Sequence, residues 1–208
     1  MEPCQGLNLK KLKRIFDIIV SFIGIIILSP LIISISIGIK LHDGGHVYYK
    51  AVRVGKNGRL FLMYKFRSMV LNADKIGASS TTLSDPRITP LGQFIRKYKI
   101  DEIPQLYNVL YGNMSIVGPR PQVEWAVDLY TETERQVLSV RPGITDYASL
   151  NFSNEAEILE GSPDPDKTYM EIIHPQKMLL SLEYINNQSF ITDFIIIIKT
   201  ITKILYKS

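Results

Sequence analysis

The stretch IIVSFIGIIILSPLIISISIGI, residues 18–39, decides how this chain is organised. It is a run of 22 uncharged residues, and as a single α-helix it would extend roughly 33 Å, enough to cross the hydrocarbon layer of a membrane. Ser29-Pro30 lies near its middle, where a proline removes one backbone hydrogen bond and bends the helix. Attachment to a membrane is therefore the first prediction from the sequence.

Three arrangements fit this apolar run. It crosses the membrane once, or it is a signal peptide cleaved at Ser34-Ile35-Ser36, although it is long for one, or it enters the membrane and turns back at Ser29-Pro30. A proline kink is tolerated in ordinary spans. Basic residues on both flanks agree with both ends lying in the cytoplasm and give a single crossing no preferred orientation. They are Lys10, Lys11, Lys13 and Arg14 before the run and Lys40, Lys50 and Arg53 after it.

Composition and charge describe the rest of the chain. The 208 residues are 46% hydrophobic and 21% charged, which predicts a folded domain with its own core. We divide the chain into a membrane segment, residues 1–40, and a body, residues 41–208. The net charge of +4 suits an anionic partner, whether phosphate, nucleic acid or anionic lipid. Cys4 is the single cysteine, so no internal disulfide forms, and the three histidines lack the spacing of a zinc site.

The first part of the body predicts a β-hairpin. Two segments rich in Val, Tyr, Phe and Leu, residues 47–53 and 59–67, flank the turn sequence Gly55-Lys56-Asn57-Gly58. Lys65 and Arg67 are two residues apart and therefore point to the same face of the second strand. They are either solvated charges on an edge strand or two cations directed at one phosphate.

Two helices are expected after a polar loop over residues 72–89. The apolar spacing of residues 91–98 predicts the first helix and leaves Arg96 off its buried face. Asp101 fits the N-cap of the second helix, with Glu102 in its first turn. A helix N-terminus also keeps an anionic side chain ionised and binds phosphate, so a capping role and a catalytic role for Asp101 share one geometry.

Two arginines lie in segments stiffened by proline, Gly118-Pro119-Arg120-Pro121 and Arg141-Pro142-Gly143. Prolines beside an arginine commonly mark only a loop. Together with Lys65, Arg67 and Arg96, however, these arginines exceed what a small core needs. The guanidinium group matches phosphate oxygens, so the five cations are candidate phosphate ligands.

The last twenty residues are also rich in apolar side chains. Ser189 fits the N-cap of a helix that runs to the end of the chain, and lysines recur along it every four residues. This pattern is typical of a helix lying in a membrane interface, although a helix packed on the core has a similar pattern. Its apolar side consists of Phe190, Phe194, Ile197, Ile198, Ile201 and Leu205.

Taken in order, several motifs resemble the bacterial sugar transferases, which are monotopic polyprenyl-phosphate phosphoglycosyl transferases, here of the small single-domain type. Each motif alone is weak, but the ordered set is specific and covers nearly the whole chain. The motifs are Lys13-Arg14-Ile15-Phe16-Asp17, Ser29-Pro30, Lys65-Phe66-Arg67-Ser68-Met69, Asp101-Glu102-Ile103-Pro104-Gln105-Leu106, Asn108-Val109-Leu110, Met114-Ser115-Ile116-Val117-Gly118-Pro119-Arg120-Pro121, Arg141-Pro142-Gly143-Ile144-Thr145 and Tyr184 to Phe190.

The resemblance implies an α+β, mostly helical fold. Its expected parts are a re-entrant membrane helix broken at Ser29-Pro30, a small β-hairpin and amphipathic interfacial helices, with the body facing the cytoplasm at the bacterial inner membrane. The implied reaction moves a sugar-1-phosphate from a UDP-sugar to polyprenyl (undecaprenyl) phosphate and releases UMP. This is the first membrane step in building a capsule, exopolysaccharide, O-antigen (lipopolysaccharide) or glycoprotein glycan.

The resemblance also implies roles for individual residues. Asp101 would attack the sugar-bearing phosphate, form a covalent phosphosugar intermediate and contact Mg²⁺, the expected cofactor. Glu102 would position the metal or accept a proton. One segment departs from the family pattern, because residues 146–152 read DYASLNF where many relatives read GWAQVNG, and this leaves the sugar open. The expected phosphate ligands are Lys65, Arg67, Arg96, Arg120 and Arg141.

The rival hypothesis is a basic, membrane-tethered binding module without catalysis. It explains the charge and the apolar run but not an Asp-Glu pair accompanied by proline-bracketed arginines. The sequence lacks the basic stripe with interleaved aromatic residues that nucleic-acid binding requires, so we expect no nucleic-acid partner. A second rival is a multi-span phosphosugar transferase of the other architecture, but this sequence contains one segment of spanning length. The expected partners are the UDP-sugar, the polyprenyl phosphate and the lipid bilayer, and a homo-oligomer stays open.

Overall fold

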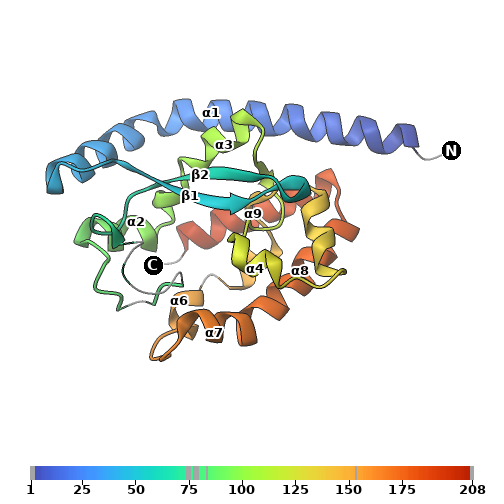
Figure 1. The fold of residues 1–208 in the computed structure, drawn as a ribbon. Helices are drawn as coiled ribbons and strands as arrows, with labels where there is room; N and C mark the ends of the chain where they lie inside the picture. Colours follow the sequence, from blue (N-terminus) through green and yellow to red (C-terminus); the bar gives the residue numbers. More distant parts are fainter. Residues whose placement is uncertain (1–2, 74–75, 77–79, 83, 153, 207–208) are drawn as a thin grey trace.

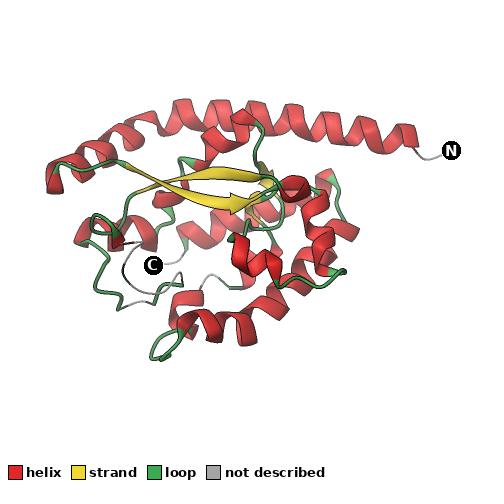
Figure 2. Cartoon of the chain, in the orientation of Figure 1, coloured by secondary structure: helices red, strands yellow, loops and turns green. Residues whose placement is uncertain are grey.

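The computed structural model describes residues 3–73, 76, 80–82, 84–152 and 154–206, with side chains from residue 10 onward. The described chain is mostly helical with two small sheets, which confirms the predicted α+β class (Figures 1 and 2). In order, its elements are α1 (Pro3–Asp43), β1 (Tyr48–Val54), η1 (Lys56–Gly58), β2 (Leu60–Phe66), α2 (Pro90–Lys97), η3 (Ile100–Glu102), α3 (Gln105–Tyr111), β3 (Ser115–Val117), α4 (Glu124–Asp128), η4 (Glu134–Ser139), β4 (Gly143–Thr145), α5 (Tyr147–Asn151), α6 (Glu155–Ile158), α7 (Pro165–Thr168), η5 (Tyr169–Ile173), α8 (His174–Asn186) and α9 (Phe190–Leu205).

Helix α1 stays helical through Ser29-Pro30, which corrects the expected break at this position. Pro30 has no amide hydrogen to donate to the carbonyl oxygen of Ile26, four residues earlier. The Ser29 hydroxyl group donates to that oxygen instead, over 2.7 Å. Because the carbonyl group is satisfied, the helix bends gradually and does not turn back on itself (Figure 1).

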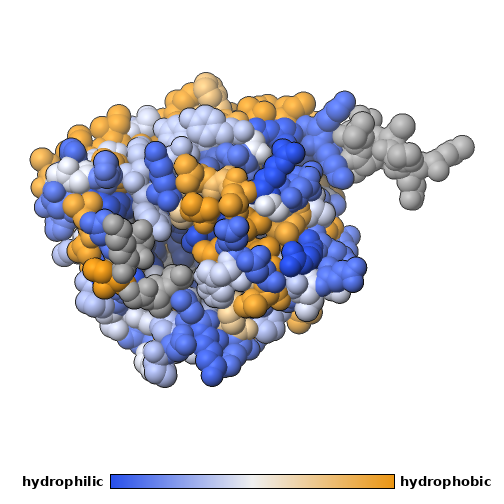
Figure 3. Space-filling model, in the orientation of Figure 1, coloured by the Kyte–Doolittle hydropathy of each residue, from blue (hydrophilic) through white to orange (hydrophobic). Residues whose placement is uncertain are grey.

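One side of α1 packs on the body and the other side is exposed. On the packed side, Ile32, Ile35 and Ile39 form a buried cluster with Phe66 of β2 and Ile95 of α2. The part Lys10–Asp43 is long and apolar enough to cross a membrane. Figure 3 shows apolar residues along the upper edge of the molecule, where α1 runs. The exposed apolar residues of α1 are Leu12, Ile15, Ile18, Ile19, Phe22, Ile23, Ile26, Ile27, Ile33, Ile37 and Leu41.

The predicted hairpin is present, with β1 and β2 antiparallel and Tyr48 opposite Phe66. Asn57 turns the chain between the strands at a φ of 56°. Asn108 of α3 completes the free edge of β2, because its side chain accepts a hydrogen bond from the Tyr64 amide over 2.8 Å and donates to the Leu62 carbonyl over 2.7 Å. Helix α3 is thereby fixed on the strand that carries Lys65.

The short strands β3 and β4 are parallel and bring the two proline-bracketed arginine segments together. A Cβ atom on Gly143 would lie 2.1 Å from the Gly118 backbone nitrogen, and one on Gly118 would lie 2.5 Å from the Arg141 carbonyl oxygen. Neither position accepts a side chain without moving backbone. The two glycines therefore allow the close contact that places Arg120 beside β4.

Candidate active site

Asp101 lies in the 3₁₀ turn η3 and not at the N-cap of α3, which begins four residues later at Gln105. The predicted capping role is wrong because a cap at Asp101 would accept its hydrogen bond from the amide of residue 103 or 104. The Ile103 amide donates to the Ile100 carbonyl oxygen instead, and Pro104 has no amide hydrogen. The carboxylate is left free. Asp101 is only 7% exposed, and its buried Oδ1 atom has no hydrogen-bond partner among the described residues.

Glu102, the next residue, has two cationic partners from distant parts of the chain. Lys65 of β2 donates to Glu102 Oε1 over 3.0 Å. Arg120, which follows β3, binds both carboxylate oxygens, and its bond to Oε2 measures 3.0 Å. Arg120 also donates to the Ile144 carbonyl oxygen over 3.2 Å, which ties the guanidinium group to β4. The two adjacent carboxylates therefore differ sharply in their partners.

This difference separates the pKa values of the two carboxyl groups. Burial raises the pKa of Asp101, and the positive charge of Lys65 opposes that effect without cancelling it. Burial also acts to raise the pKa of Glu102, but the charges of Arg120 and Lys65 outweigh it and hold that pKa well below its usual range. Two neighbouring carboxyl groups whose pKa values are shifted in opposite directions are typical of active sites in which the two groups have different roles.

The structure brings together some, but not all, of the predicted phosphate ligands. Lys65 and Arg120 meet at Glu102. Arg96 of α2 lies close enough that its charge favours the ionised form of Asp101. Lys99 acts on Asp101 in the same way and was missed by the sequence analysis. It is held in a left-handed turn with a φ of 57°, and no motif or spacing singles out a lysine in such a turn.

Arg67 and Arg141 bind partners elsewhere in the chain. Arg67 forms a two-pronged ion pair with Asp43 at the end of α1, so it does not share a ligand with Lys65. Arg141 donates to the Gly112 carbonyl oxygen over 2.9 Å, at the C-terminal end of α3. Asp101 precedes the opposite end of that helix. Both arginines therefore have hydrogen-bond partners that spacing alone could not show.

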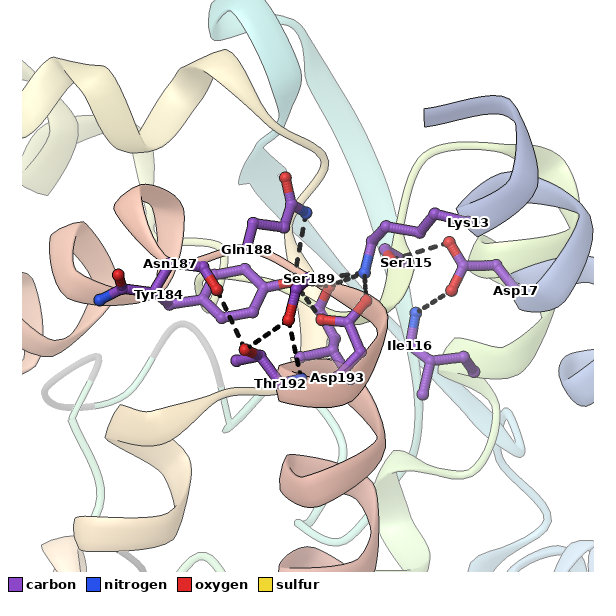
Figure 4. A network of polar contacts seen from close by, with 11 residues as sticks. Lys13, Asp17, Ser115, Ile116, Tyr184, Asn187, Gln188, Ser189, Thr192 and Asp193 are labelled. Atoms are coloured by element: carbon purple, nitrogen blue, oxygen red, sulfur yellow. Dashed lines mark hydrogen bonds and ion pairs between the residues drawn. The ribbon is translucent and has the colours of Figure 1, made fainter. Parts of the chain in front are cut away.

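A buried polar network ties α1 to the strand that leads to Arg120 (Figure 4). Asp17 of α1 accepts hydrogen bonds from the Ser115 hydroxyl over 2.8 Å and from the Ile116 amide over 3.1 Å. Lys13, one turn earlier on α1, donates to the Val117 carbonyl oxygen over 3.1 Å and pairs with Asp193 of α9. Each residue of β3 thus has a hydrogen bond to α1, in addition to the bonds that β3 forms with β4, and Arg120 follows three residues after the strand.

The same network reaches the C-terminal helices. The Tyr184 hydroxyl group of α8 donates to Asp193 over 2.7 Å and accepts from Gln188 over 3.2 Å. Tyr184 is fully buried and Asp193 is 3% exposed, so these groups depend on one another for hydrogen bonds.

Replacing Lys13 by methionine is expected to leave Asp193 buried with its charge unpaired. The cost in unfolding free energy is about 3 kcal/mol, as for other buried pairs that lose one partner. Because β3 also loses a contact, turnover should fall even at temperatures where the variant is fully folded. Thermal unfolding and rate measurements on Lys13→Met and on the exposed control Lys11→Met check this, and equal behaviour of the two variants would contradict it.

Residues 146–152, which differ from the family pattern, and the residues that follow them also include side chains near Arg120. Asp146 caps α5 through a 2.7 Å hydrogen bond from the Ser149 amide, is fully buried and leaves its Oδ2 atom without a partner among the described residues. The ion pair of Glu155 with Lys177 lies close by, and the Lys177 ammonium group sits 5.2 Å from the centre of the Tyr169 ring. Different side chains in this segment therefore change the surroundings of Arg120.

No group of three His, Cys, Asp or Glu side chains forms a metal site within the described ranges. Asp101 Oδ1 is a buried carboxylate oxygen without a hydrogen-bond partner among the described residues. In proteins Mg²⁺ is often held by one or two carboxylates together with substrate phosphates, so it does not require a full set of protein ligands.

The fold and this site define a class: a membrane protein whose body holds a buried, unpaired carboxylate beside a cluster of cations suited to phosphate groups. Comparison with known proteins identifies the family. Residues 8–207 match the model of the bacterial sugar transferases. The chain belongs to this family, and it is a transferase.

Three relatives illustrate the similarity. The exopolysaccharide production protein ExoY of Sinorhizobium fredii is 31% identical over 97% of this chain and 87% of its own length. The UDP-N-acetylgalactosamine-undecaprenyl-phosphate N-acetylgalactosaminephosphotransferase of Aeromonas hydrophila is 38% identical over 93% of this chain and 44% of its own length. The UDP-glucose:undecaprenyl-phosphate glucose-1-phosphate transferase of Escherichia coli is 35% identical over 97% of this chain and 41% of its own length. The chain thus spans most of the first relative and less than half of the other two.

Proposed function

We propose that this protein transfers a sugar-1-phosphate from a UDP-sugar to polyprenyl phosphate, with Asp101 as the nucleophile. The observation that carries the proposal is the buried, unpartnered Asp101 carboxylate beside a Glu102 that is neutralised by Lys65 and Arg120. The names of two relatives support the substrates, because both state an undecaprenyl-phosphate acceptor and a UDP-sugar donor.

The reaction takes place in two displacements at one phosphorus atom. An Asp101 carboxylate oxygen first attacks the phosphorus that bears the sugar, and the bond from that phosphorus to the bridging oxygen breaks, so that UMP leaves with the electron pair. A phosphate oxygen of the polyprenyl phosphate then attacks the same phosphorus, and Asp101 leaves as a free carboxylate. An acyl phosphate is reactive enough to pass its phosphoryl group on in this way.

The surroundings of Asp101 support its role as the attacking group. Its Oδ1 atom has no hydrogen bond that must break before a bond to phosphorus forms. The charges of Lys65, Lys99 and Arg96 favour the ionised, reactive form of the carboxyl group. They also offset the negative charge of an approaching diphosphate, which would otherwise repel the carboxylate.

Glu102 has a different role in this proposal. Its low pKa makes it a weak base, so it is poorly suited to accept a proton from the acceptor phosphate. Its two oxygens instead hold Lys65 and Arg120 in fixed positions. Glu102 is therefore a positioning residue for the two cations that face the donor phosphates.

Magnesium fits this site through Asp101. Both oxygens of Glu102 are bonded to cations, whereas Asp101 Oδ1 is buried and free. Asp101 would hold the ion through the carboxylate oxygen that does not attack phosphorus, together with donor phosphate oxygens, and the bound ion would supply charge that stabilises the leaving UMP.

We further propose that the body lies on the cytoplasmic side of the inner membrane and that α1 does not cross the bilayer. From Lys13 to Asp43 the helix extends about 45 Å, yet both residues contact the same body, Lys13 through Asp193 and Asp43 through Arg67. A single crossing would separate these ends by the bilayer. The exposed apolar face of α1 instead inserts into one leaflet.

Thiol labelling checks this topology. Cys4 precedes the apolar run, and a cysteine replacing the exposed His42 follows it. The two thiols are labelled separately, Cys4 in the wild-type protein and the new thiol in a Cys4→Ser/His42→Cys variant, with a maleimide that does not cross membranes. Both should react in inverted vesicles, which expose the cytoplasmic side, and neither should react in spheroplasts. Labelling from opposite sides would show a true crossing.

The activity itself is tested by UMP release. The purified chain in detergent, with Mg²⁺ and undecaprenyl phosphate, is given a panel of UDP-sugars that includes UDP-glucose and UDP-N-acetylgalactosamine. We expect continuous UMP release with at least one donor, and about one UMP per protein molecule when the acceptor is left out. A basic binding module without catalysis would release none with any donor.

A further inference from the structure

An open groove of about 480 Å³ lies between α5 and α9, outside the candidate active site. None of Asp101, Glu102, Lys65 or Arg120 lines it. A phosphate bound in the groove is therefore not in contact with the reacting groups. Its lining residues are Tyr147, Leu150 and Asn151 of α5, Lys199, Thr202 and Lys203 of α9, and Tyr206 just after α9.

The chemistry of the lining fits an anion. The groove holds two ammonium groups, two tyrosine hydroxyl groups and one amide group that can donate hydrogen bonds, and no acidic side chain of the described residues lines it. The Thr202 hydroxyl group already donates to backbone carbonyl oxygens of α9. Lys203 is anchored by its hydrogen bond to the Leu150 carbonyl oxygen, which keeps its charge at the α5 side. Lys199, four residues earlier, lies on the same side of α9.

The position of the groove on α9 indicates which kind of anion would reach it. Asp193 and Ile196 face the body and are buried. Successive residues of an α-helix are turned by about 100° around its axis, so the groove residues of α9 lie on a second face, beside this buried one. On its other side the second face adjoins a third face, which is exposed and apolar. A helix that puts such a face into lipid holds the adjoining polar groups at the depth of the lipid head groups. The exposed apolar residues are Ile191, Phe194, Ile195, Ile198, Ile201 and Leu205.

We propose that the α5–α9 groove binds the anionic phosphodiester head group of a membrane phospholipid, with Lys199 and Lys203 as its main ligands. The bound lipid does not react. It fixes the C-terminal helix at the membrane surface, on a different element from α1. This binding does not depend on the proposed transferase chemistry.

Retention of single lipids by the full-length protein tests the groove. The Asp101→Asn protein in maltoside micelles is mixed with dioleoyl phosphatidylglycerol or dioleoyl phosphatidylcholine, and bound lipid is counted by native mass spectrometry. Using this variant separates the result from catalysis. One phosphatidylglycerol should be retained in preference to phosphatidylcholine. Lys199→Gln/Lys203→Gln should weaken that retention roughly tenfold or more, since each lysine near a lipid surface contributes about fivefold.

A matched control removes the same charge elsewhere. Lys56→Gln/Arg59→Gln, at the hairpin turn, should retain phosphatidylglycerol like the parent protein. If the double lysine variant fails to fold, Lys199→Gln alone, at an exposed position, should still show a roughly fivefold loss. Equal retention of the two lipids, or no effect of the lysine changes, would overturn the proposal. One-for-one displacement of phosphatidylglycerol by undecaprenyl phosphate would also overturn it, by assigning the groove to the acceptor.

Discussion

Replacing Asp101 by asparagine is expected to abolish UMP release and, at neutral pH, to raise the unfolding temperature of the protein. The rate should fall by about 10⁴-fold or more, as when other enzymes lose their nucleophile, because an amide oxygen does not form the acyl phosphate. The stability should rise because burial raises the pKa of Asp101 in the folded protein. Between the unfolded and folded pKa values the unfolded chain releases this proton first, so the residue lowers stability as the pH rises.

The control for this prediction is Asp128→Asn, which changes an exposed aspartate of α4 and should alter neither quantity. Thermal unfolding at several pH values separates the two effects of Asp101→Asn. The gain in stability should vanish below about pH 4, where both states of the wild type are protonated. An Asp101→Asn protein that still turns over, or that unfolds more readily at neutral pH, would remove Asp101 from its proposed role.

Replacing Arg120 by methionine is expected to have the second largest effect. The change leaves Glu102 with Lys65 as its remaining partner in a site where its side chain is 12% exposed. Loss of one partner from a buried ion pair costs about 3–5 kcal/mol of unfolding free energy. If Arg120 faces the donor phosphates as proposed, its loss should also reduce turnover by about 10²–10³-fold.

The pH dependence of this variant follows from Glu102. In the wild type its pKa is depressed, so Glu102 contributes stability above its unfolded pKa and loses that contribution as the pH falls through the folded pKa. Without Arg120 the folded pKa rises, and acid unfolding should begin at a higher pH. Denaturant titrations across this pH range measure the shift, with the exposed Arg135→Met as the control.

A double variant separates the structural role of Arg120 from its role in the reaction. In Arg120→Met/Glu102→Gln the side chain at position 102 no longer carries a charge that needs Arg120, and the charge of Lys65 still acts on Asp101, so the double variant should recover part of the lost stability. It should not recover turnover, because the cation facing the phosphates is still absent. Recovery of both quantities would mean that Arg120 acts only by holding Glu102.

Local patterns predicted most of the secondary structure correctly. The hairpin, the helix over residues 91–98 and the capped C-terminal helix follow from periodicity and turn residues, and all three are present. The break at Ser29-Pro30 was wrong because the effect of a proline depends on whether the freed carbonyl group finds another donor. In α1 the Ser29 hydroxyl supplies that donor.

Pairings between distant residues could not be predicted. Lys65 and Arg67 share a strand pattern, but Lys65 pairs with Glu102 whereas Arg67 pairs with Asp43. Arg120 and Arg141 share a proline motif, yet Arg120 binds the Glu102 carboxylate whereas Arg141 binds the Gly112 carbonyl oxygen. In each case the partner comes from a separate element, and spacing within one segment carries no information about it. The proposed roles of these residues therefore need the measurements above.

The most direct test of the central claim is a search for the covalent intermediate. The wild-type protein is incubated with Mg²⁺ and the UDP-sugar that supports UMP release, without polyprenyl phosphate, and its peptides are then examined by mass spectrometry. We predict a phosphosugar adduct on the peptide that contains Asp101, located at that side chain and discharged when undecaprenyl phosphate is added. Release of UMP with no adduct at Asp101 would contradict the claim.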